Sequence, residues 1–294
     1  MQPFFDHLEA IRRERKSTLC VGLDPRLAQI PPEIRAEAGD DPESLLRTFC
    51  FEVLDLVAEE AACVKPQIAF FEAHGLPGLR AYAAVLAEAR RRGVLVIGDV
   101  KRGDIGSTAA AYAAGHLRPG ADFEVDAMTV NPYLGGDALQ PLIDAATEAG
   151  KGLYVLVRTS NPGGRDLQEL LVGEAKTPLF EETAALIDRL GAEHVSPETG
   201  LSAVGAVVGA TAPEAGARIR SLLPRTPFLV PGYGAQGATA QDVAVSHRTD
   251  GSGVVVNASR SIIHPALEGR SWREAVAASA RHAREELYRA SAGA

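Results

Sequence analysis

Cysteine is scarce in this chain, with only Cys20, Cys50 and Cys63 among 294 residues. The number is odd, and the intervals between these residues do not match the spacing of metal ligands. The sequence therefore predicts neither a disulfide framework nor a metal site such as zinc, and it favours a reducing compartment.

Long apolar stretches and excess positive charge are also missing. No apolar run reaches the length of a membrane span, and residues 1–9 place charged side chains where a signal peptide needs an apolar segment. The formal net charge is -8 with a pI near 5.5, which argues against general affinity for nucleic acid or anionic lipid because both attract clustered positive charge. We expect a soluble, cytoplasmic protein that binds neither nucleic acid nor membranes. Any anionic ligand must then be held by a local site.

What the sequence does contain is a series of short apolar runs. Hydrophobic residues make up 46% of the chain, which is enough for one large core. The runs are rich in Val, Leu and Ile with little polar alternation, as strands buried on both faces require. They are Thr18–Leu23, Ala62–Lys65, Val94–Val100, Val125–Val130, Leu153–Val157, Val204–Val208, Phe228–Val230 and Val254–Val256. Eight strand-helix units predict an α/β fold, a (β/α)8 TIM barrel, with residues 1–294 as a single domain.

Helices are predicted between the runs. In Leu45–Glu60, four apolar residues recur at i, i+4, i+7 and i+8, which gathers them on one helical face. Leu79–Arg92 and Trp272–Tyr288 have similar patterns.

Two regions depart from this alternation. Pro25–Pro42 is rich in Pro, Ala and Gly, and Asn161–Pro178 together with Ala192–Gly200 is longer than a normal barrel connection. We expect both regions to be surface excursions.

Polar or special residues follow nearly every apolar run at its C-terminal end. In a barrel, catalytic residues come from this end of the strands and from the loops that follow. The ordinary polarity of loops explains any one of them as well, but their joint occurrence indicates a single polar rim. They are Asp24, Lys65, Asp99 with Lys101, Asn131, Thr159 with Ser160, Thr211, Gly232, and Asn257 with Arg260.

One charged cluster in this rim gives the clearest indication of a functional site. Asp99 and Lys101 are two residues apart, so on a strand both side chains would point to one face and into one pocket. The direction of Asp104, in the loop beyond, is not fixed by the sequence. A structural ion pair is the plain alternative. Against it, the apolar lead-in Val94–Ile97 favours burial, and a buried lysine between carboxylates keeps a proton available for transfer.

Two later segments indicate a phosphate site. The glycine-rich run Pro231–Gly237 follows the seventh apolar run and can bring backbone N–H groups close to a ligand. Arg260 follows the eighth run and supplies a guanidinium that can fork two phosphate oxygens. The glycines alone would suit an ordinary turn, but loops seven and eight are where barrel enzymes commonly bind phosphate.

Six motifs stand in order across most of the chain: Val21–Pro25, Val64–Glu72, Asp99–Ile105, Thr159–Gly163, Pro231–Gln236 and Ser259–Ser261. As a set, they resemble the motifs of the orotidine 5′-phosphate decarboxylase family, in its longer bacterial (type 2) branch. The central Asp-x-Lys-x-x-Asp motif alone is shared with related sugar-phosphate decarboxylases. Two departures from the commonest form of the family are the extra length near Asp166–Glu198 and Ser259, which stands where many members have glycine.

The resemblance implies roles for individual residues. Lys101 would donate a proton to the carbon that loses carbon dioxide, and Asp99 would face the departing carboxylate. Lys65 and Asp104 would complete an alternating charge network. Asp104 would reach the neighbouring subunit's site, beside Ile105 and Thr108, which implies a homodimer with shared active sites. The other implied substrate contacts are Asp24 for the ribose, Ser160 for the pyrimidine, Pro231 in the substrate site, and Gln236 and Arg260 for the phosphate.

The implied reaction converts orotidine 5′-phosphate to uridine 5′-monophosphate and carbon dioxide, the last step of de novo pyrimidine nucleotide synthesis. It leaves a carbanion in the ring plane, and the sequence has no cofactor motif to delocalise it. Fixed charge must then stabilise the carbanion before a lysine protonates it. We expect an enzyme without cofactor or metal. The alternatives are a metal-dependent phosphosugar decarboxylase or aldolase of the same superfamily, and a catalytically silent phosphate-binding barrel.

Overall fold

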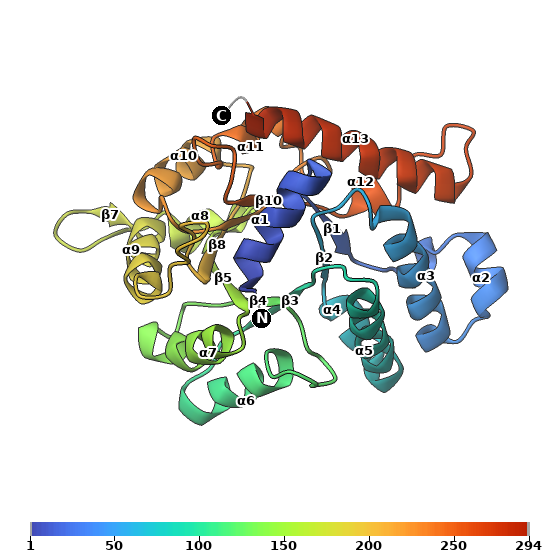
Figure 1. Ribbon diagram of the computed structural model, residues 1–294, viewed down its shortest axis with the longest axis horizontal. Helices are drawn as coiled ribbons and strands as arrows, with labels where there is room; N and C mark the ends of the chain where they lie inside the picture. The colour runs from blue at the N-terminus through green and yellow to red at the C-terminus, as the bar shows by residue number, and fades with distance from the viewer. Residues whose placement is uncertain (1, 293–294) are drawn as a thin grey trace.

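The eight apolar runs form eight parallel strands of one sheet in the computed structural model, which describes residues 2–292 (Figure 1). Most strands differ from the predicted runs by one to three residues at an end. The reason is that a run is defined by its apolar residues, whereas a strand is defined by hydrogen-bonded pairing with its neighbours. The strands are β1 Leu19–Leu23, β2 Cys63–Pro66, β3 Ile97–Arg102, β4 Ala127–Val130, β5 Gly152–Arg158, β8 Val204–Val208, β9 Phe228–Pro231 and β10 Val254–Ala258.

The sheet curls until its two outer strands meet. Neighbouring strands follow the order β2-β1-β10-β9-β8-β5-β4-β3. Two isolated parallel bridges, Val64↔Val96 and Gln67↔Asp99, join the edge strands β2 and β3. The predicted (β/α)8 barrel is therefore confirmed.

Helices surround the sheet, and the three predicted from periodicity are confirmed as α3, α5 and α13. The start of α3 has a local cause: Asp41 accepts a hydrogen bond from the Ser44 N–H at 2.9 Å, and Pro42 occupies the first helical position. The helices are α1 Phe4–Arg15, α2 Pro32–Ala38, α3 Pro42–Val57, α4 Ala69–Glu72, α5 Gly75–Arg91, α6 Gly106–His116, α7 Gly136–Glu148, α8 Arg165–Gln168, α9 Leu179–Gly191, α10 Pro213–Leu222, α11 Ala240–Ala244, α12 Arg260–Ile263 and α13 Trp272–Ala292, with short 3-10 turns η1 Leu27–Gln29 and η2 Pro162–Gly164.

Helix α1 closes the amino-terminal end of the barrel, and the sequence analysis did not predict it. Its residues Phe4, Phe5, Leu8 and Ile11 are buried together with side chains from inside the barrel, including Tyr154. Each such side chain contributes about 1.5–3 kcal/mol by leaving water. With this end filled, the open end of the barrel is the carboxyl-terminal one.

The two irregular regions behave differently from each other. Pro25–Pro42 contains α2 and buries Ile30 and Ile34 in the main core, so the expectation of a surface excursion was wrong there. The segment after β5 forms η2, α8 and a small hairpin of β6 Leu171–Val172 and β7 Thr177–Pro178. Most of this segment is exposed, as predicted.

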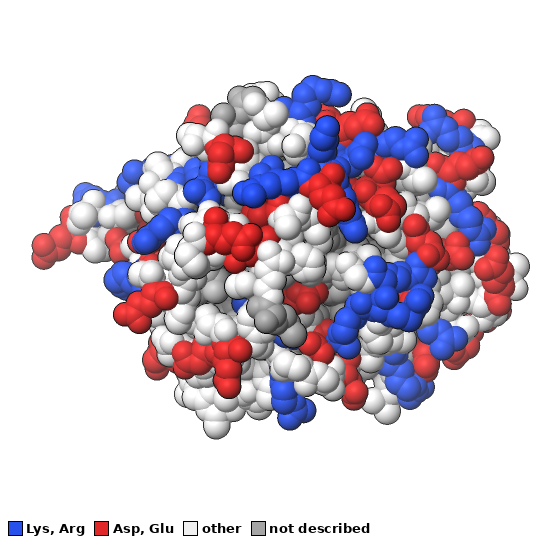
Figure 2. All heavy atoms as spheres, in the orientation of Figure 1, with Lys and Arg blue, Asp and Glu red and all other residues white. Residues whose placement is uncertain are grey.

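The surface carries both signs of charge. On the face drawn in Figure 2, basic and acidic side chains are interspersed over most of the surface. No helix in the described part of the chain combines the length and the apolar character that a membrane crossing needs.

Candidate active site

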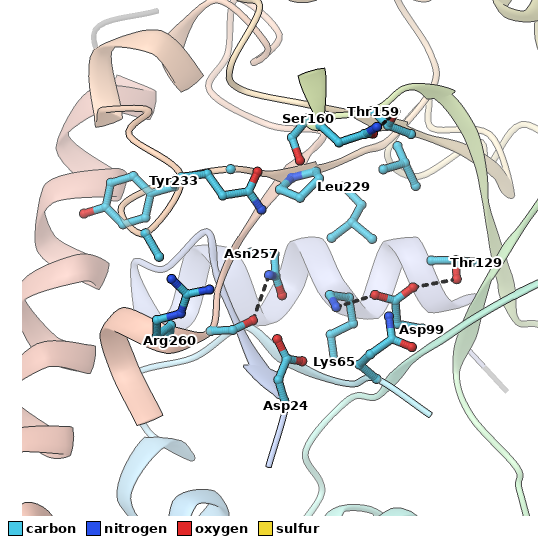
Figure 3. A pocket seen from close by; sticks show the side chains of 18 of the residues that line it. Asp24, Lys65, Asp99, Thr129, Thr159, Ser160, Leu229, Tyr233, Asn257 and Arg260 are labelled. Atoms are coloured by element: carbon cyan, nitrogen blue, oxygen red, sulfur yellow. Dashed lines mark hydrogen bonds and ion pairs between the residues drawn. The ribbon is translucent and has the colours of Figure 1, made fainter. Parts of the chain in front are cut away.

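A pocket of about 340 Å³ opens at the carboxyl-terminal ends of the strands, opposite α1 (Figure 3). The residues of the predicted polar rim line it, except Asn131 and Thr211. Of the predicted site residues, those that line the pocket are Asp24, Lys65, Asp99, Lys101, Ser160, Pro231, Gln236 and Arg260.

Three charged side chains meet at one end of this pocket. Lys65 Nζ donates to Asp99 Oδ2 at 2.6 Å, and both side chains are buried. Lys101 Nζ pairs with the other oxygen, Asp99 Oδ1, while its own side chain stays 45% exposed. Asp99 therefore lies between two ammonium groups. That of Lys65 is buried in the barrel, and that of Lys101 is open to the pocket.

This arrangement favours the charged forms of Asp99 and Lys65. Burial raises the pKa of Asp99, but the attraction of Lys65 and Lys101 outweighs it and holds that pKa well below its usual range. Burial lowers the pKa of Lys65, and Asp99 followed by Asp24 more than reverses the effect, so the Lys65 pKa lies above its usual range. A carboxylate and two ammonium groups leave one positive charge in excess beside the cavity.

Lys101 reaches the pocket for a different reason from the one predicted. Strand alternation would have placed it on the same face as Asp99, but Lys101 has φ +44°, outside the strand region. The register of β3 on β4 also shifts between Gly98 and Arg102. A bulge, rather than regular pleating, directs Lys101 toward Asp99.

The opposite end of the pocket combines Arg260 with the loop after β9 (Figure 3). Gly232 has φ +112°, and a Cβ there would come within 3.3 Å of Thr211 Cγ2, so glycine is needed at this position. Gln236 and Arg260 are both exposed beside the cavity. Their N–H groups, with the backbone of the loop, suit a phosphate.

Between the two ends lie Asp24 and Asn257 (Figure 3). Asp24 Oδ1 is buried and has no hydrogen-bond partner among residues 2–292. A buried carboxylate oxygen without a donor is costly, so a hydroxyl group of a ligand fits this position.

Gly22 leaves the space that the side chain of Ser259 occupies. The Ser259 hydroxyl accepts a hydrogen bond from Asn257 Nδ2 at 3.2 Å, and a Cβ on Gly22 would come within 1.9 Å of Ser259 Oγ. The serine side chain therefore faces the pocket wall at β1 and does not cap α12.

Side chains from elsewhere hold the loop that carries Ser160. Thr211 Oγ1 donates to the Ser160 carbonyl at 3.0 Å. Gln168 Oε1 accepts from the Thr159 N–H at 2.9 Å, and Gln168 Nε2 donates to Thr159 Oγ1 at 2.9 Å. The extra segment after β5 thus contacts the site through α8.

Three predicted site residues do not line the pocket of their own chain. Asp104 is half-buried, Thr108 is exposed, and Ile105 is 59% exposed. Asp104 Oδ1 accepts a local hydrogen bond, from the Ile105 N–H at 2.8 Å.

Several pocket residues were not predicted, among them Thr129, Tyr233 and His264. Tyr233 stands inside the glycine-rich run and was available to the same reasoning as Gln236. Thr129 lies within an apolar run, where a lone threonine carries no signal of function. Within residues 2–292, no group of three or more His, Cys, Asp or Glu side chains is arranged to hold a metal ion.

The sequence of this chain is similar to those of known proteins. Residues 17–275 match the sequence model of the Orotidine 5'-phosphate decarboxylase / HUMPS family. The chain is 40% identical to an orotidine 5'-phosphate decarboxylase of Rhodopirellula baltica, over 98% of this chain and 99% of the relative. It is 47% identical to one of Deinococcus radiodurans, over 84% of each chain.

Solved structures of proteins with the same description are also similar to this chain. A putative orotidine-monophosphate-decarboxylase from Toxoplasma gondii superposes with a TM-score of 0.86 at 34% identity, covering 99% of this chain and 97% of that one. A putative orotidine 5'-phosphate decarboxylase from Streptomyces avermitilis gives a TM-score of 0.82 at 37% identity, covering 100% and 97%.

Proposed function

This chain belongs to the orotidine 5′-phosphate decarboxylase family, and from that premise we propose how its pocket binds orotidine 5′-phosphate and removes carbon dioxide. The activity is that of a carboxy-lyase which forms uridine 5′-monophosphate in pyrimidine synthesis. The observation that carries the mechanism is the Lys65–Asp99–Lys101 array at the end of the pocket opposite Arg260.

The phosphate is assigned to Arg260 and Gln236, which orients the nucleotide along the pocket. Asp24 Oδ1, which has no partner among residues 2–292, would accept a hydrogen bond from a ribose hydroxyl. Ser160, beside Pro231 in the pocket wall, would contact the pyrimidine. The reacting end of the ring then lies at the charged array.

Lys101 is assigned as the proton donor. Its ammonium is open to the pocket and paired on one side with Asp99, so it can face the carbon that loses carbon dioxide. Because one positive charge is in excess, the array stabilises the carbanion as it forms. Lys101 then delivers its proton to that carbon. Lys65 holds Asp99 from the other side and fixes the position of the carboxylate.

An ultraviolet assay of orotidine 5′-phosphate tests the function. Purified protein should consume this substrate, and EDTA should not change the rate. No turnover, or turnover lost in EDTA and restored by a divalent cation, would favour the metal-dependent phosphosugar enzymes of the same superfamily instead.

We also propose that two copies of the chain form a dimer in which Asp104, Ile105 and Thr108 complete the partner's pocket. None of the three lines the pocket of its own chain. Exposed apolar side chains stand on the same and the next connection, including Ile105 at 59% and Tyr133 at 76% exposure. A second copy covering this region would remove them from water.

Mixing two inactive variants tests the shared site. Lys101→Ala and Asp104→Ala subunits, mixed in equal amounts and allowed to exchange, should restore about a quarter of the wild-type sites. Half of the dimers would be mixed, and each would hold one intact site. Lys101→Ala subunits alone are the control. No recovery after demonstrated exchange would mean that Asp104 acts within its own subunit.

We propose that residues 1–294 form one domain and that the protein is cytoplasmic. All eight barrel strands lie in one sheet. Cys20, Cys50 and Cys63 are free and buried, which suits a reducing compartment.

A further inference from the structure

Thr129 lies on β4 directly beside the charged array, and only 1% of its surface is exposed. Figure 3 shows its hydroxyl directed at Asp99. Nothing in the assigned mechanism uses this residue, yet its contacts connect the two groups on which the mechanism depends.

The Thr129 hydroxyl makes three hydrogen bonds. It accepts from the Val100 N–H at 3.0 Å and from the Lys101 N–H at 2.9 Å. It lies 3.0 Å from Asp99 Oδ1 and donates to it. A hydroxyl has one proton and two lone pairs, so this set uses it completely. Because both lone pairs are occupied, the hydroxyl proton points to Asp99 Oδ1, which accepts it.

The bulge in β3 explains why two N–H groups need this hydroxyl. On β3, Gly98 pairs with Met128 of β4, and Arg102 pairs with Val130. Three residues of β3 therefore lie opposite Thr129 alone, and the regular ladder cannot satisfy all their N–H groups. The side chain of Thr129 supplies the missing acceptor for Val100 and Lys101.

The same contact holds Lys101 in an unusual backbone conformation. At φ +44° a residue with a Cβ is in the left-handed region, which its side chain disfavours. Such a conformation persists only where its surroundings enforce it. The hydrogen bond to the Lys101 N–H acts at the point where the chain turns toward the pocket.

We propose that Thr129 is a positioning residue for the proton donor: its hydroxyl fixes the bulge that aims Lys101 and orients the Asp99 carboxylate that pairs with the Lys101 ammonium. The inference rests on the proposed function, because it takes Lys101 as the donor. It predicts that loss of the hydroxyl impairs the chemical step more than substrate binding.

Thr129→Val and Thr129→Ser form a matched pair for the test. Valine keeps the size and branching but removes the hydroxyl, whereas serine keeps the hydroxyl and removes a methyl group. With orotidine 5′-phosphate as substrate, Thr129→Val should lower kcat about 100-fold, as expected for a misplaced catalytic group. KM and the affinity for uridine 5′-monophosphate should change less than about threefold, because Arg260, Gln236 and Asp24 are untouched. Thr129→Ser should recover most of kcat.

Three outcomes would overturn the inference: near-normal kcat in Thr129→Val, equal losses in Thr129→Val and Thr129→Ser, or a loss confined to KM. If Thr129→Val does not fold, Thr129→Ala takes its place in the same comparison. The wild-type assay keeps the two proposals separate. An inactive wild type contradicts the proposed function, whereas an active wild type with an active valine variant contradicts only the role of Thr129.

Discussion

Lys101 combines two properties that rarely occur together, a charged side chain open to a cavity and a left-handed backbone. Asp99 compensates the charge, and Thr129 satisfies the backbone N–H. The ammonium is thereby held close to one position, so little reorganisation is needed when negative charge develops next to it.

Replacing Lys101 by alanine should lower kcat at least about 1,000-fold, because both the electrostatic stabilisation and the proton donor are lost. Binding of uridine 5′-monophosphate should remain measurable by titration. Lys176→Ala is a matched control, since Lys176 is an exposed lysine that also has positive φ, at +50°. A near-normal rate in Lys101→Ala would show that another group protonates the carbanion.

At the level of residues, the sequence indicated charge but not how that charge is held. Lys65, Asp99 and Lys101 were recognisable because they belong to a series of polar residues that follow the apolar runs, and because Asp99 and Lys101 are two residues apart on one strand. Thr129 was not, because its role depends on the register between β3 and β4, which no short motif records. Asp104 remains a prediction for the partner's site.

Helix α8 illustrates how one element supports another. Its segment was predicted to be a surface excursion, yet Gln168 reaches back to the backbone and hydroxyl of Thr159. Arg158 adds a second attachment through Glu169, with 2.7 Å between Arg158 Nη2 and Glu169 Oε1. The excursion therefore braces the loop that carries Ser160.

Gln168→Ala should weaken substrate recognition, because it leaves the Thr159 N–H without its acceptor. We expect kcat/KM for orotidine 5′-phosphate to fall about tenfold, mainly through KM. The thermal midpoint should hardly change, because α8 is at the surface. Leu167→Ala is the neighbouring control, since Leu167 is 44% exposed. Equal effects in the two variants would mean that α8 acts only through general packing.

The elements themselves were largely predictable. All eight strands followed from short apolar runs, and the helices α3, α5 and α13 followed from apolar periodicity. Helix α1 has the same signal, with Phe4, Leu8 and Ile11 at i, i+4 and i+7, but the sequence analysis considered this segment only as a signal peptide. Proline and glycine in Pro25–Pro42 concealed α2, whose first residue is a proline that suits a helix start.

For the molecule as a whole, two buried histidines link stability to pH. Burial is the main cause that lowers the pKa of His116 and of His247 from 6.5 to about 4. Arg102 adds to the effect at His116, and Arg220 adds to it at His247. The folded protein therefore resists protonation at both positions.

The sign of the effect follows from proton binding. Below pH 6.5 the unfolded chain takes up protons that the folded chain refuses until about pH 4, so the stabilisation is complete above pH 6.5 and is lost as pH falls. Each histidine should cost about 2 kcal/mol between pH 7.5 and pH 5. Urea unfolding at a fixed protein concentration measures this loss. His116→Asn should reduce the pH dependence, whereas His7→Asn, at an exposed position, should not. Equal stability at the two pH values would contradict this account.

The junction between β2 and β3 is the most sparsely paired part of the barrel, and an ion pair crosses it. The other neighbouring strands are paired along ladders, two of them with a register shift, but here two isolated bridges close the ring. The buried Lys65–Asp99 ion pair crosses this same junction, from one edge strand to the other. A sheet without free edges is protected from pairing with other chains. The charges that act on the substrate thus also hold β2 and β3 together. A variant that breaks the Lys65–Asp99 ion pair should therefore loosen this junction, and expose two strand edges, as well as impair catalysis.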